Sequence, residues 1–178
     1  EFTHPMKTPS ASVYVFCQGK MKDNQTDALY GSMALDLMVI QCANTIRGKY
    51  GASYQVRLFD RMMGNDSWQG HVYFQTDPKI AGEMKNIAMD EMKRFMEGDI
   101  NEAEFNICKN KLIKKRTEEL KSNQWWVNNA LPEYYLSKKS IVPTYLDEVN
   151  NLSLEGLKSF TRSIYAQGNI VDVVMKSK

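Results

Sequence analysis

Residues 54–78 read YQVRLFDRMMGNDSWQGHVYFQTDP and decide the fold class. We expect strands over Tyr54–Met62 and Gly70–Thr76, joined by Met63–Ser67, whose Gly-Asn-Asp content is turn chemistry. Two strands joined by a short polar connection pair antiparallel. The closing Asp77-Pro78 supplies an N-cap and a first-turn proline for a helix. The stretch therefore predicts a hairpin followed directly by a helix.

The chain before the hairpin predicts a strand and a long helix. Ser10–Gln18 alternates valines with aromatic residues, so we expect a strand that is buried on both faces. Asp27 is the expected N-cap of the helix. The apolar stripe of this helix consists of Leu29, Met33, Leu37, Ile40 and Ala43.

The chain after the hairpin predicts mainly helices. Gly98 stops the first of them, and Asn101 followed by Glu104 fits a capping box for the next. An aromatic helix follows, broken near Pro132, and we expect Trp125 and Trp126 on it to be core residues. The expected elements are helices over Lys79–Glu97, from Asn101, over Ser122–Ser140, Pro143–Val149 and Ser153–Tyr165, and a final strand over Ile170–Met175.

Hairpin strands with helices gathered after them, without a βαβ rhythm, predict an α+β fold. We expect a two-layer sandwich in which helices cover one face of a mostly antiparallel sheet. A chain of 178 residues with 43% hydrophobic content can bury one core. A single domain is therefore expected over residues 10–176, with residues 1–9 as a linker or a cloning remnant.

Composition argues against several classes of function. The formal net charge is +2, and the basic cluster from Lys109 to Arg116 is followed at once by Glu118 and Glu119, which favours a solvated helix face over a nucleic-acid site. The three cysteines show no C-x-x-C spacing and lie among apolar residues, so neither a disulfide nor a thiolate metal site is expected. No apolar run is long enough to span a membrane.

The sequence also offers little that could catalyse a reaction. Neither His4 nor His71 begins H-E-x-x-H or H-x-x-E-H, the patterns that place two imidazoles on one helix face. There is no G-x-S-x-G, no phosphate-binding glycine loop and no G-x-G-x-x-G. A cysteine paired with His71 has no supporting signature. We therefore expect no catalytic residue and no metal ligand in this chain.

One segment remains as a candidate for function, and it reads IRGKYGASY at residues 46–54. In the simpler interpretation, Arg47 complements the dipole of a helix end, and Gly48 and Gly51 permit a tight connection to a strand. In the alternative, a sharp joint between helix and strand holds the guanidinium of Arg47 and the phenol of Tyr54 on one rim, where both can donate to a carbonyl oxygen. The residues alone favour the simpler interpretation.

The order of these elements resembles a known family. A long helix ending in Ile-Arg-x-Lys-x-x-x-x-Tyr is followed by a hairpin, an Asp-Pro helix start and a lysine-rich Asn-x-x-Glu helix. This order is similar to the C-terminal-half domain of the pitrilysin and insulin-degrading-enzyme family of inverzincin metallopeptidases, with bacterial pitrilysin-like zinc proteases nearest in character. The resemblance runs from about Ser10 to Lys176, and the chain departs from it at Gly48, where the family commonly has an acidic residue.

The resemblance implies a division of labour between two halves that form a closed chamber. The N-terminal half would carry the zinc and its H-x-x-E-H motif, while this chain would bind the peptide substrate through Arg47 and Tyr54. The chain would then be inactive in isolation, with the zinc-binding half as its partner. The alternative is a catalytically inactive structural or interaction subunit of the same fold. The resemblance favours a periplasmic or cell-envelope location, with the cytoplasm as the alternative.

Overall fold

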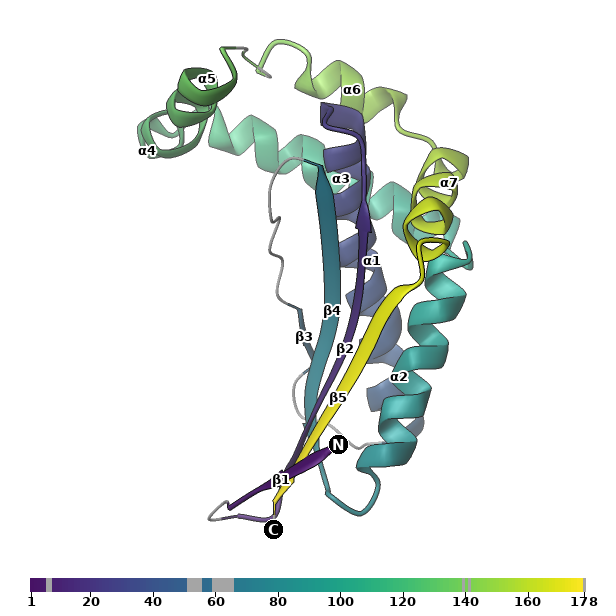
Figure 1. The fold of residues 1–178 in the computed structure, drawn as a ribbon. Coiled ribbons are helices and arrows are strands. Elements are labelled where there is room, and N and C mark those ends of the chain that lie inside the picture. The colour runs from purple at the N-terminus through teal and green to yellow at the C-terminus, as the bar shows by residue number, and fades with distance from the viewer. Residues whose placement is uncertain (6–7, 51–55, 59–65, 139, 141, 178) are drawn as a thin grey trace.

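The computed structural model describes residues 1–5, 8–50, 56–58, 66–138, 140 and 142–177 (Figure 1). The strands are β1 (Phe2–His4), β2 (Ala11–Lys20), β3 (Val56–Leu58), β4 (Ser67–Thr76) and β5 (Asn169–Ser177). The helices are α1 (Gln25–Tyr50), α2 (Ala81–Met96), α3 (Glu102–Glu119), α4 (Asn123–Trp125), a π-helical turn η1 (Trp126–Ala130), α5 (Leu131–Ser137), α6 (Tyr145–Asn151) and α7 (Leu154–Tyr165).

The strands form one sheet in the order β1-β5-β2-β4-β3. The pairs β5-β2, β2-β4 and β4-β3 are antiparallel, and only the short β1 lies parallel to β5. The predicted hairpin is thus present in β3 and β4, with β4 beginning three residues earlier than expected and the connecting residues 59–65 lying outside the described part. Residues 1–9, expected as a linker, contribute β1, and Glu1 Oε1 lies 2.6 Å from Lys176 Nζ.

Helices cover one face of the sheet, which confirms the predicted two-layer α+β architecture. Helix α1 contacts β3 and β4, α2 contacts β2, β4 and β5, and α7 contacts β2. Helices α3 and α6 contact α1 rather than the sheet. On the covered face of β2, Val13, Val15 and Cys17 are fully buried, because alternate residues of a strand point to the same side.

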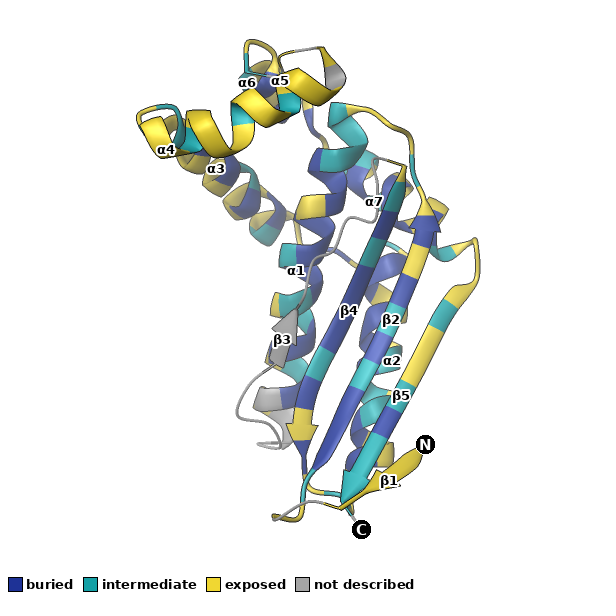
Figure 2. Cartoon of the chain, turned by 60° about the vertical axis from the view of Figure 1, so that its left-hand side comes forward, coloured by how far each residue is buried: buried dark blue, intermediate teal, exposed yellow. Residues whose placement is uncertain are grey.

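The other face of the sheet has no helical cover in the described chain, and Figure 2 looks onto it. Tyr14 and Phe16 of β2 lie there half-buried, so the prediction that this strand is buried on both faces was wrong for one face. The ring centroid of Tyr14 lies 4.5 Å from that of Tyr73, and the centroid of Phe16 lies 5.2 Å from that of His71. Cross-strand aromatic pairs therefore stabilise the open face without a covering layer.

Two helix starts agree with the predicted caps and two do not. The side chains of Asn101 and Ser153 accept backbone N–H groups at the starts of α3 and α7, as expected. Helix α1, however, begins before the predicted cap Asp27, because Asn24 Oδ1 accepts the N–H of Asp27 at 2.7 Å. Asp77 accepts the N–H of Lys79, which forms a turn ahead of α2 instead of capping it.

The segment α4-η1-α5, residues 123–137, projects from the body and is called the arm below (Figure 1). The predicted break falls in η1, just before Pro132, where the N–H of Leu131 reaches back to the carbonyl of Trp126. A proline removes a backbone N–H and displaces the preceding turn, which a π-helical turn accommodates. The expectation that Trp125 and Trp126 are core residues was wrong, because Trp126 is 41% exposed and Trp125 is only partly buried.

Trp68 is the largest fully buried side chain and connects the two layers. Its indole Nε1 donates to the carbonyl oxygen of Gly31 in α1 at 3.0 Å. A Cβ added at Gly70 would lie 2.5 Å from the indole ring, and one added at Gly31 would lie 2.7 Å from it. The absence of side chains at these two glycines is therefore what lets the indole lie between α1 and β4.

We predict that Gly70→Ala lowers the free energy of unfolding by about 1–3 kcal/mol, because the new methyl group overlaps the Trp68 ring. The matched control is Gly82→Ala in α2, where an added Cβ meets nothing within 4 Å and removal of a helical glycine should stabilise by up to about 1 kcal/mol. Urea denaturation of both variants measures the difference. Equal effects of the two substitutions would contradict the proposed packing.

Candidate functional site

The last turn of α1 carries Arg47, the first of the two predicted substrate-binding residues. The helix continues through Gly48 to Tyr50, so Gly48 is helical and not part of a connection. The side chain of Arg47 and the whole of Tyr54 lie outside the described residues. The structure thus describes the backbone that presents Arg47, and the pairing of Arg47 with Tyr54 stays a prediction.

Helix α1 is fixed by burial along its C-terminal half and by an ion pair near its middle. Met38, Cys42 and Ile46 are fully buried, and Ile46 immediately precedes Arg47. Asp36 Oδ2 lies 2.8 Å from the Nζ of Lys111 on α3. Because the side chain of Ile46 is packed in the core, rotation of α1 about its own axis at position 47 is restricted.

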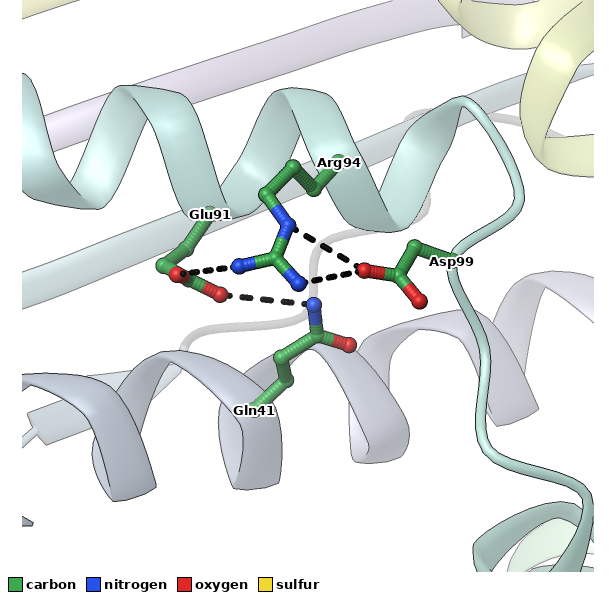
Figure 3. Close-up of polar contacts among 4 residues, drawn as sticks. All are labelled: Gln41, Glu91, Arg94 and Asp99. Atoms are coloured by element: carbon green, nitrogen blue, oxygen red, sulfur yellow. Dashed lines mark hydrogen bonds and ion pairs between the residues drawn. The ribbon is translucent and has the colours of Figure 1, made fainter.

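A polar cluster of four residues joins α1, α2 and the connection to α3 (Figure 3). Glu91 is only 6% exposed, and its two carboxylate oxygens accept from Arg94 Nη1 at 3.1 Å and from Gln41 Nε2 at 3.4 Å. Arg94 also donates from Nε and Nη2 to Asp99 Oδ2, at 3.1 and 2.6 Å. The hydrogen bond to Asp99, followed by the charge of Glu91, raises the pKa of the Arg94 guanidinium. The buried carboxylate therefore faces a permanent cation.

A polar depression of about 320 Å³ adjoins this cluster along the last two turns of α1 before Arg47. Gln41, Asn44 and Thr45 line it from α1, at the i, i+3, i+4 spacing of one helix face. Glu91 and Arg94 line it from α2. The four-residue cluster thus fixes α1 to α2 on the approach to the predicted site.

The described side chains do not assemble a thiol nucleophile. Cys17 pairs with Gly70 on the covered face of the sheet, whereas His71 pairs with Phe16 on the open face, so the two side chains point to opposite sides. Burial raises the pKa of the Cys17 and Cys108 thiols to about 11. It raises that of Cys42 to about 12, with the nearby Glu91 carboxylate as a second cause. Thiols with such pKa values are not nucleophilic near neutral pH.

Within the described residues, no three His, Cys, Asp or Glu side chains gather closely enough to hold a metal ion. His4 lies on β1, at the edge of the sheet, and His71 lies on β4. This part of the chain thus offers a zinc ion no ligand set.

None of the described helices has the length and apolar character needed to cross a bilayer.

Several basic residues of α3 have partners within the chain. Lys109 Nζ donates to the carbonyl oxygens of Asn150 and Leu152, at 2.6 and 2.9 Å. Lys111 pairs with Asp36, and Arg116 Nε lies 3.2 Å from Glu119 Oε2. For these three residues, the positive charge is used in contacts within the chain.

Sequence reasoning did not single out Glu91, although a signal for it was present. In α2, Met84, Ala88, Met92 and Phe95 are buried, and Glu91 is seven residues from Met84 on the same helix face. A carboxylate on an apolar stripe needs a partner when it is buried. That pattern could have marked the position, although Gln41 and Arg94 could not have been chosen as its partners from spacing alone.

Residues 1–112 match the sequence profile of a family described as the peptidase M16 inactive domain. No curated protein matches the sequence. The fold is similar to that of the periplasmic protease PqqL from Escherichia coli, with a TM-score of 0.86, 14% identity and coverage of 99% of this chain and 20% of that one.

Two further solved structures show the same fold. A peptidase M16 inactive domain from Pseudomonas fluorescens has a TM-score of 0.73 at 16% identity, with coverage of 98% of this chain and 42% of that one. A chain of complex III from Candida albicans has a TM-score of 0.72 at 15% identity, with coverage of 98% and 44%. The chain therefore spans less than half of the length of each of these three relatives.

We predict that the three buried thiols make stability fall at alkaline pH. Their pKa values are raised to about 11 or 12 in the folded state, so above the ordinary thiol value the unfolded chain releases protons that the folded chain keeps. The stability that they contribute is complete below about pH 9 and is lost as pH rises toward 11, by about 1.4 kcal/mol per pH unit for each thiol.

The measurement compares urea denaturation of the wild type and of Cys42→Ala between pH 8 and about 10.5, a window set by the ordinary thiol pKa. The wild type should lose stability more steeply than the variant. Tyrosine ionisation is common to both proteins, so the difference isolates the Cys42 thiol. Parallel pH profiles would show that this thiol is not protected from ionisation by the fold.

Proposed function

Because the chain belongs to the family of peptidase M16 inactive domains, we propose that it is the substrate-binding, chamber-forming domain of a zinc metalloendopeptidase. In this proposal, zinc is bound by another domain of the enzyme and supplies an activated water there. This chain binds and orients the peptide. The observation that carries the proposal is the family match.

The peptide carbonyl is bound by Arg47 and Tyr54 in this proposal. Arg47 lies in the last turn of α1, and Tyr54 follows seven residues later in the sequence. A guanidinium and a phenol can both donate to one carbonyl oxygen, and such donors are worth most where charge develops on that oxygen. The fixed position of Ile46 supports this role, because a donor must be held in place before the reaction to be effective.

The alternative is a catalytically inactive structural or interaction subunit, in which Arg47 only ends a helix. The similarity in fold to a chain of complex III supports this alternative. An intact H-x-x-E-H motif in the rest of the polypeptide would support the peptidase. A degenerate motif there would support the structural subunit.

The proposed partner is the zinc-binding half of the same protease, and the arm offers a surface for it. Six large apolar side chains of the arm are exposed, from 41% at Trp126 to 83% at Leu136. The other members of this group are Val127, Leu131, Tyr134 and Tyr135. A concentration of exposed apolar side chains is typical of a protein interface, and the three structural relatives described above are each more than twice as long as this chain.

We predict that Arg47→Ala and Tyr54→Phe in the full-length enzyme each reduce turnover by about tenfold to a hundredfold, because each removes one donor to the carbonyl oxygen. Zinc content should not change, because neither residue is a metal ligand in this proposal. The control is Lys114→Ala, an exposed residue on α3. Wild-type turnover in both substrate-site variants would end the assignment.

We predict that Leu131→Asp and Leu136→Asp weaken the association of this domain with the separately expressed remainder of the protease by about tenfold or more, because a charge would then be buried at an apolar contact. Titration by isothermal calorimetry measures the change. The control is Ile107→Asp, since Ile107 is 67% exposed on α3 but lies outside the arm. An unchanged affinity in both arm variants would remove the arm from the interface.

A further inference from the structure

Helices α1 and α2 contact each other, and the core around them is rich in methionine. Met33 and Met38 of α1 and Met84, Met92 and Met96 of α2 are all buried. Methionine has an unbranched, flexible side chain that adapts to its surroundings and therefore specifies one packing arrangement poorly. A directional contact between the two helices would do what these side chains do poorly, which is to fix how far α1 lies along α2.

Glu91 of α2 makes such a contact, although it is only 6% exposed (Figure 3). One carboxylate oxygen accepts from Gln41 Nε2 of α1 at 3.4 Å, and the other accepts from Arg94 Nη1 at 3.1 Å. Gln41 lies six residues before Arg47 in the same helix. The buried carboxylate thus joins α2 to α1 within two helical turns of the predicted substrate-binding residue.

The guanidinium of Arg94, which pairs with this carboxylate, is itself held in place at the end of α2. It donates from Nε and Nη2 to Asp99 Oδ2, and the backbone N–H of Asp99 donates to the carbonyl of Arg94 at 3.0 Å. Gly98, between them, has a φ of +100°, as expected for a glycine that closes a helix in this way. Arg162 Nε of α7 donates to the carbonyl of Glu97 at 2.9 Å. The end of α2 is therefore fixed both to its own final turn and to α7.

The polar depression continues from this cluster toward Arg47. Asn44 and Thr45 line it beyond Gln41, and Arg47 follows Asn44 by three residues, a spacing at which two helix positions share a face. Because α1 runs unbroken to Tyr50, a shift of the helix at Gln41 also moves the backbone at Arg47. A displacement of about 1 Å in a group that orients a substrate can reduce the rate by about a hundredfold.

We propose that Glu91 is a positioning residue for Arg47. Held by Arg94, its carboxylate fixes the axial position of the last turns of α1 through Gln41, and with it the place at which Arg47 meets the peptide carbonyl. The inference rests on the proposed function for the role of Arg47 and adds the group that holds this donor in place. A buried polar cluster can specify one packing arrangement even where it adds little stability, so turnover should be affected more than stability.

The test begins with Gln41→Ala in the full-length enzyme. This variant removes the contact to α1 while Glu91 stays paired with Arg94, so no buried charge loses its only partner. We expect kcat to fall about fivefold or more with KM within about twofold of wild type, because a misplaced donor weakens the transition state more than the bound substrate. The matched control is Asn86→Ala, which removes an exposed amide from α2 and should keep wild-type kcat.

A double-variant cycle separates positioning from general stability. If Gln41 acts through Arg47, adding Gln41→Ala to Arg47→Ala should cause no further loss of kcat, whereas a merely structural effect would multiply. The pair Gln41→Glu with Glu91→Gln should recover kcat to within about twofold of wild type, because the new amide can accept from Arg94 and donate to the new carboxylate. Equal kcat values for Gln41→Ala and Asn86→Ala, multiplicative losses in the cycle, or no recovery in the exchanged pair would each overturn the proposal.

Hydrogen exchange in the 178-residue chain tests the helix end without the enzyme assay. The amides of residues 47–50 should exchange about threefold or more faster in Gln41→Ala than in Asn86→Ala. If they do while Arg47→Ala keeps full turnover, Glu91 still fixes the helix end and the carbonyl site fails. If Arg47→Ala loses turnover while Gln41→Ala changes neither exchange nor kcat, the positioning role fails and the carbonyl site stands.

Discussion

The close approach of α1 to β4 at Trp68 is the constraint on which the rest of the structure depends. The indole is bonded to the Gly31 carbonyl and lies over Gly70, and its ring meets Phe160 of α7 edge-on at a centroid distance of 6.3 Å. One side chain thereby sets the position of a strand and of two helices. Because α1 runs unbroken for 26 residues from Gln25 to Tyr50, this packing also directs the far end of the helix. The placement of the backbone at Arg47 therefore depends on packing in the core of the domain.

A second buried side chain, Arg116, fixes the base of the arm to the body of the domain. Its guanidinium lies 3.7 Å from the ring centroid of Tyr145 and 4.6 Å from that of Trp125, and the residue is 8% exposed. A cation between two aromatic faces, with the Glu119 carboxylate at 3.2 Å, couples α3, α4 and α6. The apolar residues of the arm are consequently exposed on a segment that is anchored at its base. This is the condition under which an exposed surface can serve as a preformed interface.

Features set by residues close together in the sequence could be predicted, whereas features set by contacts between distant elements could not. The caps at Asn101 and Ser153 were predictable because both partners lie within three residues. The cap at Asp27 was assigned wrongly because Asn24, three residues earlier, is an equally good acceptor and lies nearer the true start. The exposure of Trp126 and the partners of Glu91 depend on which helices meet in space, and no local pattern encodes that. The family resemblance supplied Arg47 and Tyr54, and their roles remain proposals.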